Sequence, residues 1–69
     1  MDQHEAMNTL RAKYRSEWDA YQVIAGRNTQ LRLAGREPSA EQLEYERVAA
    51  AAVARAREEL LAAIARGGV

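Results

Sequence analysis

The sequence lacks cysteine and phenylalanine and has one proline, one histidine and four glycines among its 69 residues. Without cysteine, neither a disulfide nor a thiolate metal site can reinforce the fold. The single histidine, His4, has no second imidazole at metal-ligand spacing. No HExxH, GxSxG or glycine-rich phosphate-loop motif occurs. These absences argue against an enzyme, and we expect no catalytic residue, no cofactor and no metal.

The chain also lacks an excess of either charge and any long apolar run. Ten Lys and Arg residues balance ten Asp and Glu residues, so no overall field attracts nucleic acid or an anionic membrane. No apolar stretch approaches the roughly 18 residues of a membrane span, and the first ten residues do not resemble a secretory signal. We therefore expect a cytoplasmic protein with neither a nucleic-acid nor a membrane partner. The frequent alanine and arginine are typical of bacteria with GC-rich genomes.

The first half of the chain has the apolar periodicity of a long amphipathic helix, predicted over residues 3–34. One face of this helix holds Met7, Leu10, Tyr14, Trp18, Tyr21, Ile24, Ala25, Asn28 and Leu31. Within it, positions 7, 10, 14, 17, 21, 24, 28 and 31 have the alternating spacing of three and four residues that is typical of a coiled-coil seam. Gly35 follows this pattern as a residue that accepts the left-handed conformation at a helix end. We expect the helix to stop there.

A second helix is predicted over residues 39–66. Ser39 can cap its N-terminus, and Gln42, three residues later, can complete a capping box. Pro38 discourages the first helix from continuing. A turn of about four residues, 35–38, favours a helical hairpin over a linker between domains. The fold class predicted is all-α, a single domain over residues 1–69 built as a coiled-coil-like antiparallel two-helix hairpin.

A bend near residue 37 predicts that facing residues have numbers that sum to about 74. The expected seam positions on the second helix are Leu43, Glu46, Ala50, Val53, Arg57, Leu60 and Ile64. Two polar layers interrupt this seam, where Glu17 meets Arg57 and Asn28 meets Glu46. If these pairs are buried, a slipped register would leave charges without partners. If they lie at the hydrated edge of the seam, they have little effect on register.

The second helix also carries a row of small residues beside its seam. We expect this row to bind a second copy of the chain, together with Trp18 and Ala25 of the first helix. The row consists of Tyr45, Ala49, Ala52, Ala56 and Ala63. A chain of this length buries only about 60% of its unfolded surface, so it needs additional stabilisation. The sequence predicts a homodimeric four-helix bundle, with a tetramer as the alternative.

The predicted function is therefore that of a non-enzymatic, self-associating interaction or assembly module. A small adaptor or co-chaperone that holds a partner's helix in an apolar groove is a second interpretation. In shape alone, the hairpin resembles the Rop-type dimeric RNA binders and the hairpin co-chaperones of type III secretion needle subunits. The first resemblance implies an RNA-binding dimer, for which Arg11 and Arg15 are the basic candidates.

Overall fold

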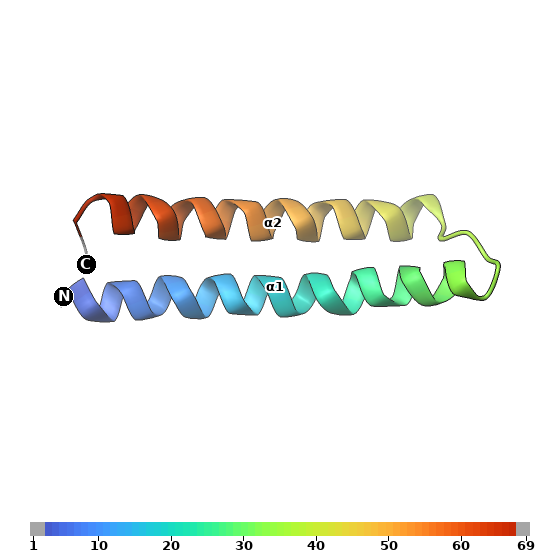
Figure 1. The fold of residues 1–69 in the computed structure, drawn as a ribbon. Helices are drawn as coiled ribbons and strands as arrows, with labels where there is room; N and C mark the ends of the chain where they lie inside the picture. Colours follow the sequence, from blue (N-terminus) through green and yellow to red (C-terminus); the bar gives the residue numbers. More distant parts are fainter. Residues whose placement is uncertain (1–2, 68–69) are drawn as a thin grey trace.

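The computed structural model describes residues 3–67, and in this part of the chain it contains two α-helices. Helix α1 covers Gln3–Leu33 and helix α2 covers Ala40–Ala65. The helices lie side by side and antiparallel, so that the start of α1 and the end of α2 meet at one end of a rod (Figure 1). This rod measures 49 × 15 × 14 Å. The prediction of an all-α, two-helix hairpin is confirmed.

The ends of both helices fall within one residue of the predicted positions. Helix α1 stops at Leu33 rather than at residue 34, and α2 starts at Ala40 and ends at Ala65. The predicted domain also includes residues 1, 2, 68 and 69, which lie outside the described residues.

Gly35 ends α1 in the predicted way. Its φ of +77° is in the left-handed region, where a side chain would be strained. The Gly35 N–H donates to the Arg32 carbonyl at 3.0 Å, and the Arg36 N–H donates to the Leu31 carbonyl at 2.8 Å. These two bonds form a Schellman motif, which satisfies the last carbonyls of the helix.

Ser39 begins α2 through the predicted capping box. The Ser39 hydroxyl accepts from the Gln42 N–H at 3.1 Å, and the Ser39 N–H donates to Gln42 Oε1 at 2.7 Å. Pro38 is buried immediately before this cap. The turn therefore has its own hydrogen-bonded ends, which limits the directions in which α2 can leave it.

The face that α1 presents to α2 is the predicted one. Met7 and Asn28 are buried on it, and the remaining members are half-buried, namely Leu10, Tyr14, Glu17, Tyr21, Ile24 and Leu31. Two contacts define the register with α2: Lys13 pairs with Glu59, and Asn28 pairs with Glu46. The residue numbers of these pairs sum to 72 and 74, close to the predicted value.

The face that α2 presents to α1 differs from the prediction at every second position. Leu43, Ala50, Arg57 and Ile64 are exposed, so their assignment to the seam was wrong. The residue before each of Ala50, Arg57 and Ile64 takes its place, and the observed positions are Glu46, Ala49, Val53, Ala56, Leu60 and Ala63. Near the turn, Gln42 is exposed and contributes its backbone carbonyl to Asn28. Since successive helical residues are 100° apart, this exchange turns the contact face of α2 by about 50° toward the alanines.

The physical reason for this rotation is the size of the side chains on α1. Tyr14, Tyr21 and Ile24 fill much of the space between the helices, and small residues opposite large ones allow side chains to interdigitate. Ala56 is only 2% exposed within the single chain. The alanine row therefore contributes to the hairpin's own seam, where the sequence analysis had assigned it to a separate face.

Candidate interaction surfaces

The contact between α1 and α2 leaves two long flanks on opposite sides of the hairpin. On one side, Trp18 and Tyr21 of α1 line a hollow with Ala50 and Val53 of α2. On the other side, the Lys13–Glu59 ion pair joins the helices. These two features fix which helical positions share each flank, because residues three, four and seven apart lie on the same side of a helix.

The first surface, here called the tryptophan flank, combines arginines with apolar side chains. From α1 it takes Arg11, Arg15, Trp18, Gln22, Ala25 and Arg32, and from α2 it takes Leu43, Arg47, Ala50, Ala54, Arg57, Leu61 and Ile64. No Asp or Glu occupies any of these positions. Five arginines without a carboxylate among them make this flank basic, although the whole chain has no net charge.

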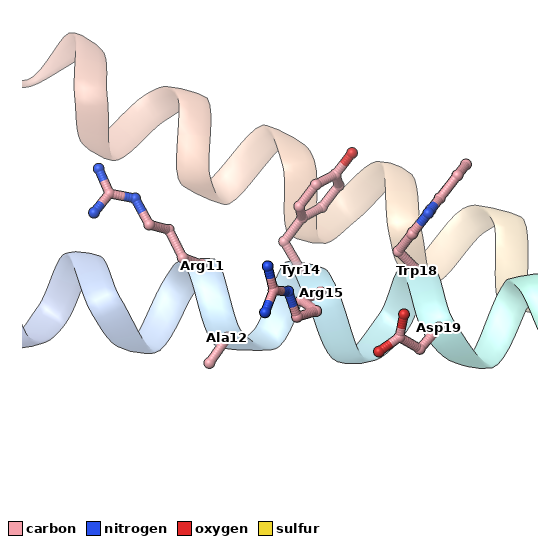
Figure 2. A pocket seen from close by; sticks show the side chains of 6 residues that line it. All are labelled: Arg11, Ala12, Tyr14, Arg15, Trp18 and Asp19. Carbon is pink, nitrogen blue, oxygen red and sulfur yellow. The ribbon is translucent and has the colours of Figure 1, made fainter.

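Figure 2 shows the part of the tryptophan flank that α1 supplies. Six residues line a shallow hollow, namely Arg11, Ala12, Tyr14, Arg15, Trp18 and Asp19. The side chains of Arg11, Tyr14 and Trp18 point toward α2 (Figure 2). Asp19 lies on the side of α1 that is farther from α2 (Figure 2). Asp19 is therefore the one carboxylate that lines this hollow, at its edge away from α2 (Figure 2).

Four of the five arginines on this flank have no ionic partner within residues 3–67. The two ion pairs there are Lys13–Glu59 and Arg47–Glu44. The hydrogen bond to Glu44, and then the charge of that carboxylate, raise the pKa of the Arg47 guanidinium above its usual value. Arg47 is thus locally neutralised, whereas Arg11, Arg15, Arg32 and Arg57 expose uncompensated positive charge.

The second surface, here called the tyrosine flank, has an apolar centre and mixed charges. It consists of Lys13, Ser16, Ala20, Val23 and Arg27 from α1, with Tyr45, Val48, Ala52, Arg55 and Glu59 from α2. Lys13 Nζ lies 3.1 Å from Glu59 Oε2. The Tyr45 hydroxyl donates to Glu41 Oε1 at 3.0 Å, and its side chain is 57% exposed. Lys13 and Glu59 therefore neutralise each other, whereas Arg27 and Arg55 have no ion pair within residues 3–67.

Of the two predicted polar layers, the structure forms the one between Asn28 and Glu46. Asn28 is 2% exposed, and its Nδ2 donates to Glu46 Oε1 at 2.8 Å and to the Gln42 carbonyl at 3.3 Å. Within residues 3–67, every buried side-chain nitrogen or oxygen has a hydrogen-bond partner. The layer is therefore a buried polar contact rather than a hydrated edge.

The other predicted layer, Glu17 with Arg57, does not form. Glu17 is half-buried in the seam, whereas Arg57 is exposed on the tryptophan flank. The register defined by Lys13–Glu59 and Asn28–Glu46 places Glu17 level with Ala56. The rotation of α2 is the reason, because it brings Ala56 into the seam and turns Arg57 out of it.

The structure also separates residues that the sequence analysis had joined in one partner interface. Trp18 and Ala25 lie on the tryptophan flank, while Tyr45 and Ala52 lie on the tyrosine flank. Ala49, Ala56 and Ala63 are in the seam between α1 and α2. The single chain thus divides these residues between two flanks and the seam, and their contact with a second copy stays a prediction.

The placement of Arg57 on the same flank as Trp18 is the feature that sequence reasoning missed. Arg57 follows Ala50, a neighbour of Trp18, by two helical turns on the same side of α2, and the register places it near the level of Trp18. Arg57 belongs to a row of residues spaced seven apart, together with Leu43, Ala50 and Ile64, and this spacing can be seen in the sequence. Only the orientation of α2 shows that this row faces outward.

The structure also bears on metal binding and on membrane crossing. Within residues 3–67, no three His, Cys, Asp or Glu side chains gather in a way that could hold a metal ion. In the same part of the chain, neither helix combines the length and the apolarity needed to cross a membrane.

No protein-family model matches this chain, and searches of curated proteins and of solved structures give no match. No activity, ligand or partner can therefore be transferred from a relative. The two flanks and their chemistry are the basis on which a function can be proposed.

Proposed function

We propose that this chain is a non-enzymatic helical hairpin that associates with a second copy of itself to form a four-helix bundle. One observation carries the proposal. Within residues 3–67, Met7, Pro38 and Ala56 are the buried apolar side chains, whereas eight large apolar side chains are at least 40% exposed. A domain with so little buried apolar area lacks the hydrophobic term that normally offsets chain entropy, and a partner helix supplies it.

The tyrosine flank is the better surface for this contact. Its centre consists of Ala20, Val23, Val48 and Ala52, which are small enough for two hairpins to approach each other closely. Val48 and Tyr45 are 48% and 57% exposed, so they have apolar area to bury. The ion pair of Lys13 with Glu59 is already neutral and can remain at the rim.

The tryptophan flank is a poor surface for self-association. A two-fold axis through it would bring Arg11, Arg15 and Arg57 against their own copies. Like charges without carboxylates between them cost free energy when water is removed. A dimer through the tyrosine flank keeps these arginines in water on both outer faces, and a tetramer would have to bring the two basic surfaces together.

The test compares Val48→Glu with Leu61→Glu in light scattering over a concentration series. Both residues are large, apolar and about half exposed on α2, at 48% and 51%, but they lie on opposite flanks. We expect a dimeric mass for the original chain and for Leu61→Glu, and a monomeric mass for Val48→Glu, because the new carboxylate would be desolvated at the interface. Far-UV circular dichroism on each sample checks that the hairpin is intact.

Two results would contradict this proposal. If Leu61→Glu dissociates the dimer and Val48→Glu does not, the contact is on the tryptophan flank. If the original chain is monomeric at all concentrations, the apolar area is left for a helix of a different protein, which is the adaptor interpretation.

A further inference from the structure

We propose that the tryptophan flank binds single-stranded nucleic acid, with Arg11, Arg15 and Arg57 on backbone phosphates and Trp18 stacked on a base. This inference concerns a different surface from the proposed dimer contact and holds for a monomer as well. It also departs from the expectation, based on the neutral net charge, that nucleic acid is not a partner.

The first argument is the distribution of charge. The chain has equal numbers of acidic and basic residues, yet this flank carries five arginines, and Asp19, at the edge of its hollow, is the one carboxylate that lines it. Arg11 and Arg15 are one turn apart, about 6 Å along the helix axis, and Arg57 joins them from α2. A local basic surface retains phosphate affinity even when the total charge is zero, because screening in salt water limits each interaction to about 10 Å.

The second argument is the kind of basic residue. The cations of this flank are all arginines, and a guanidinium can bind a phosphate through two parallel hydrogen bonds. Arg11, Arg15 and Arg57 have no ion pair within residues 3–67, so their donors remain directed to solvent. Binding a phosphate therefore requires no internal salt bridge to break.

The third argument is the position of the indole. Trp18 is 41% exposed, and its ring centroid lies 5.6 Å from that of Tyr21 at a tilt of 32°. This contact positions the indole on the rod while part of it faces water. An exposed aromatic ring beside cations is the arrangement with which proteins bind unpaired bases. Leu61 and Ile64 add apolar area next to Arg57.

Single strands fit this arrangement better than other polyanions. A duplex hides the faces of its bases, so Trp18 would contribute nothing to binding it. An acidic protein helix would pair with the arginines, but the carboxylates that do so supply no flat ring to stack on the indole. Among these partners, single-stranded RNA or DNA uses both parts of the surface.

The experiment titrates the intact chain with oligothymidylate and oligouridylate of about 20 nucleotides, at about 20 mM salt. Since Trp18 is the one tryptophan of the chain, we expect its fluorescence to be quenched on binding. Anisotropy of a labelled oligonucleotide gives the affinity. Three phosphate contacts predict that the logarithm of the binding constant falls with the logarithm of salt with a slope of about −2.

Matched variants test the named residues. Arg57→Gln should weaken binding several-fold and reduce the salt slope by about 0.7, whereas Arg55→Gln, which removes the same charge from the tyrosine flank, should change affinity less than about twofold. Trp18→Ala should weaken binding about 5- to 150-fold, the equivalent of one stacked base, and Trp18→Phe should retain most of the affinity of the original chain.

Asp19→Asn should strengthen binding about twofold, because its carboxylate borders the hollow.

Three results would overturn the proposal. No anisotropy change at low salt would exclude the interaction altogether. Equal losses from Arg57→Gln and Arg55→Gln would mean that the tryptophan flank is not the binding surface. Equal affinity for inorganic polyphosphate or for duplex DNA, with Trp18→Ala unchanged, would show that bases play no part.

Discussion

Asn28 is the buried polar residue of the contact between α1 and α2. It is nearly inaccessible to water, and its amide nitrogen donates both to a carboxylate and to a backbone carbonyl of α2. A buried polar group of this kind contributes little net stability but is costly to leave without partners. The contact therefore acts mainly on register, because a shift of α2 by one residue would remove both acceptors.

We expect Asn28→Ala to lower the free energy of unfolding by about 1–3 kcal/mol, because Glu46 and the Gln42 carbonyl lose their donor. The double variant Asn28→Leu with Glu46→Leu should recover this loss or exceed it, because an apolar pair replaces the polar one. Urea denaturation followed by circular dichroism, at one protein concentration throughout, measures both changes. Thr29→Ala, at the exposed neighbouring position, is the control and should stay within about 0.5 kcal/mol. A double variant as unstable as Asn28→Ala would contradict this explanation, because the apolar pair removes the unpaired carboxylate and fills the space left by the amide.

At the scale of the element, the two glycines of the first half of the chain have opposite roles. Gly26 lies inside α1, and a Cβ built there has no atom within 4 Å. Gly35 ends the same helix with a positive φ that an L-residue rarely adopts. The first glycine weakens α1 through its flexibility, and the second allows the chain to leave α1 and reach the cap of α2.

Substitution of these glycines by alanine should therefore have opposite signs. Gly26→Ala should raise the free energy of unfolding by about 0.5–1 kcal/mol, because alanine favours the helix and has room for its methyl group. Gly35→Ala should lower it by about 1 kcal/mol, because the left-handed conformation is strained with a Cβ. Thermal melts of the two variants, recorded at equal concentration, are the measurement. A stabilising Gly35→Ala would contradict the role assigned to the Schellman motif.

At the scale of the whole molecule, the hairpin is a thin rod with two unlike sides. One seam of alternating large and small residues holds α1 and α2 together, and the flanks beside it differ in charge. Because the rod is about as wide as two helices, almost every residue outside the seam reaches the surface. The molecule can therefore offer one side to a second copy and keep the other for a different partner.

The contact between the helices depends on Ala56, and a matched pair of variants tests this. Ala56→Glu should reduce the helical signal at 25 °C and destabilise the hairpin by about 3 kcal/mol or more, because a carboxylate would be buried level with Glu17. Ala54→Glu makes the same change at an exposed position of α2 and should stay within about 0.5 kcal/mol. Circular dichroism melts distinguish the two. If Ala56→Glu keeps its helicity and stability, the alanine row is not the seam.

Local signals in the sequence predict the structure correctly at the helix ends and on the contact face of α1. The left-handed Gly35, the capping box of Ser39 with Gln42 and the periodic stripe of α1 all have short-range causes, and each is found as expected. The predicted contact face of α2 was wrong, because it depends on how the two helices are rotated relative to each other. Both the row with Arg57 and the row with Ala56 have suitable spacing on α2, so periodicity alone could not select between them.

By itself, the sequence determined that this chain forms two helices, where each ends, and that they fold back on each other with Asn28 against Glu46. Caps, turn residues and apolar periodicity act over a few residues, so they can be recognised without a partner helix. The tertiary structure alone decided which side of α2 meets α1, and hence that Arg57 shares a flank with Trp18 while Tyr45 lies on the other flank. That choice depends on how the large side chains of α1 fit the alanines of α2, which is a property of the packed pair and of neither helix alone.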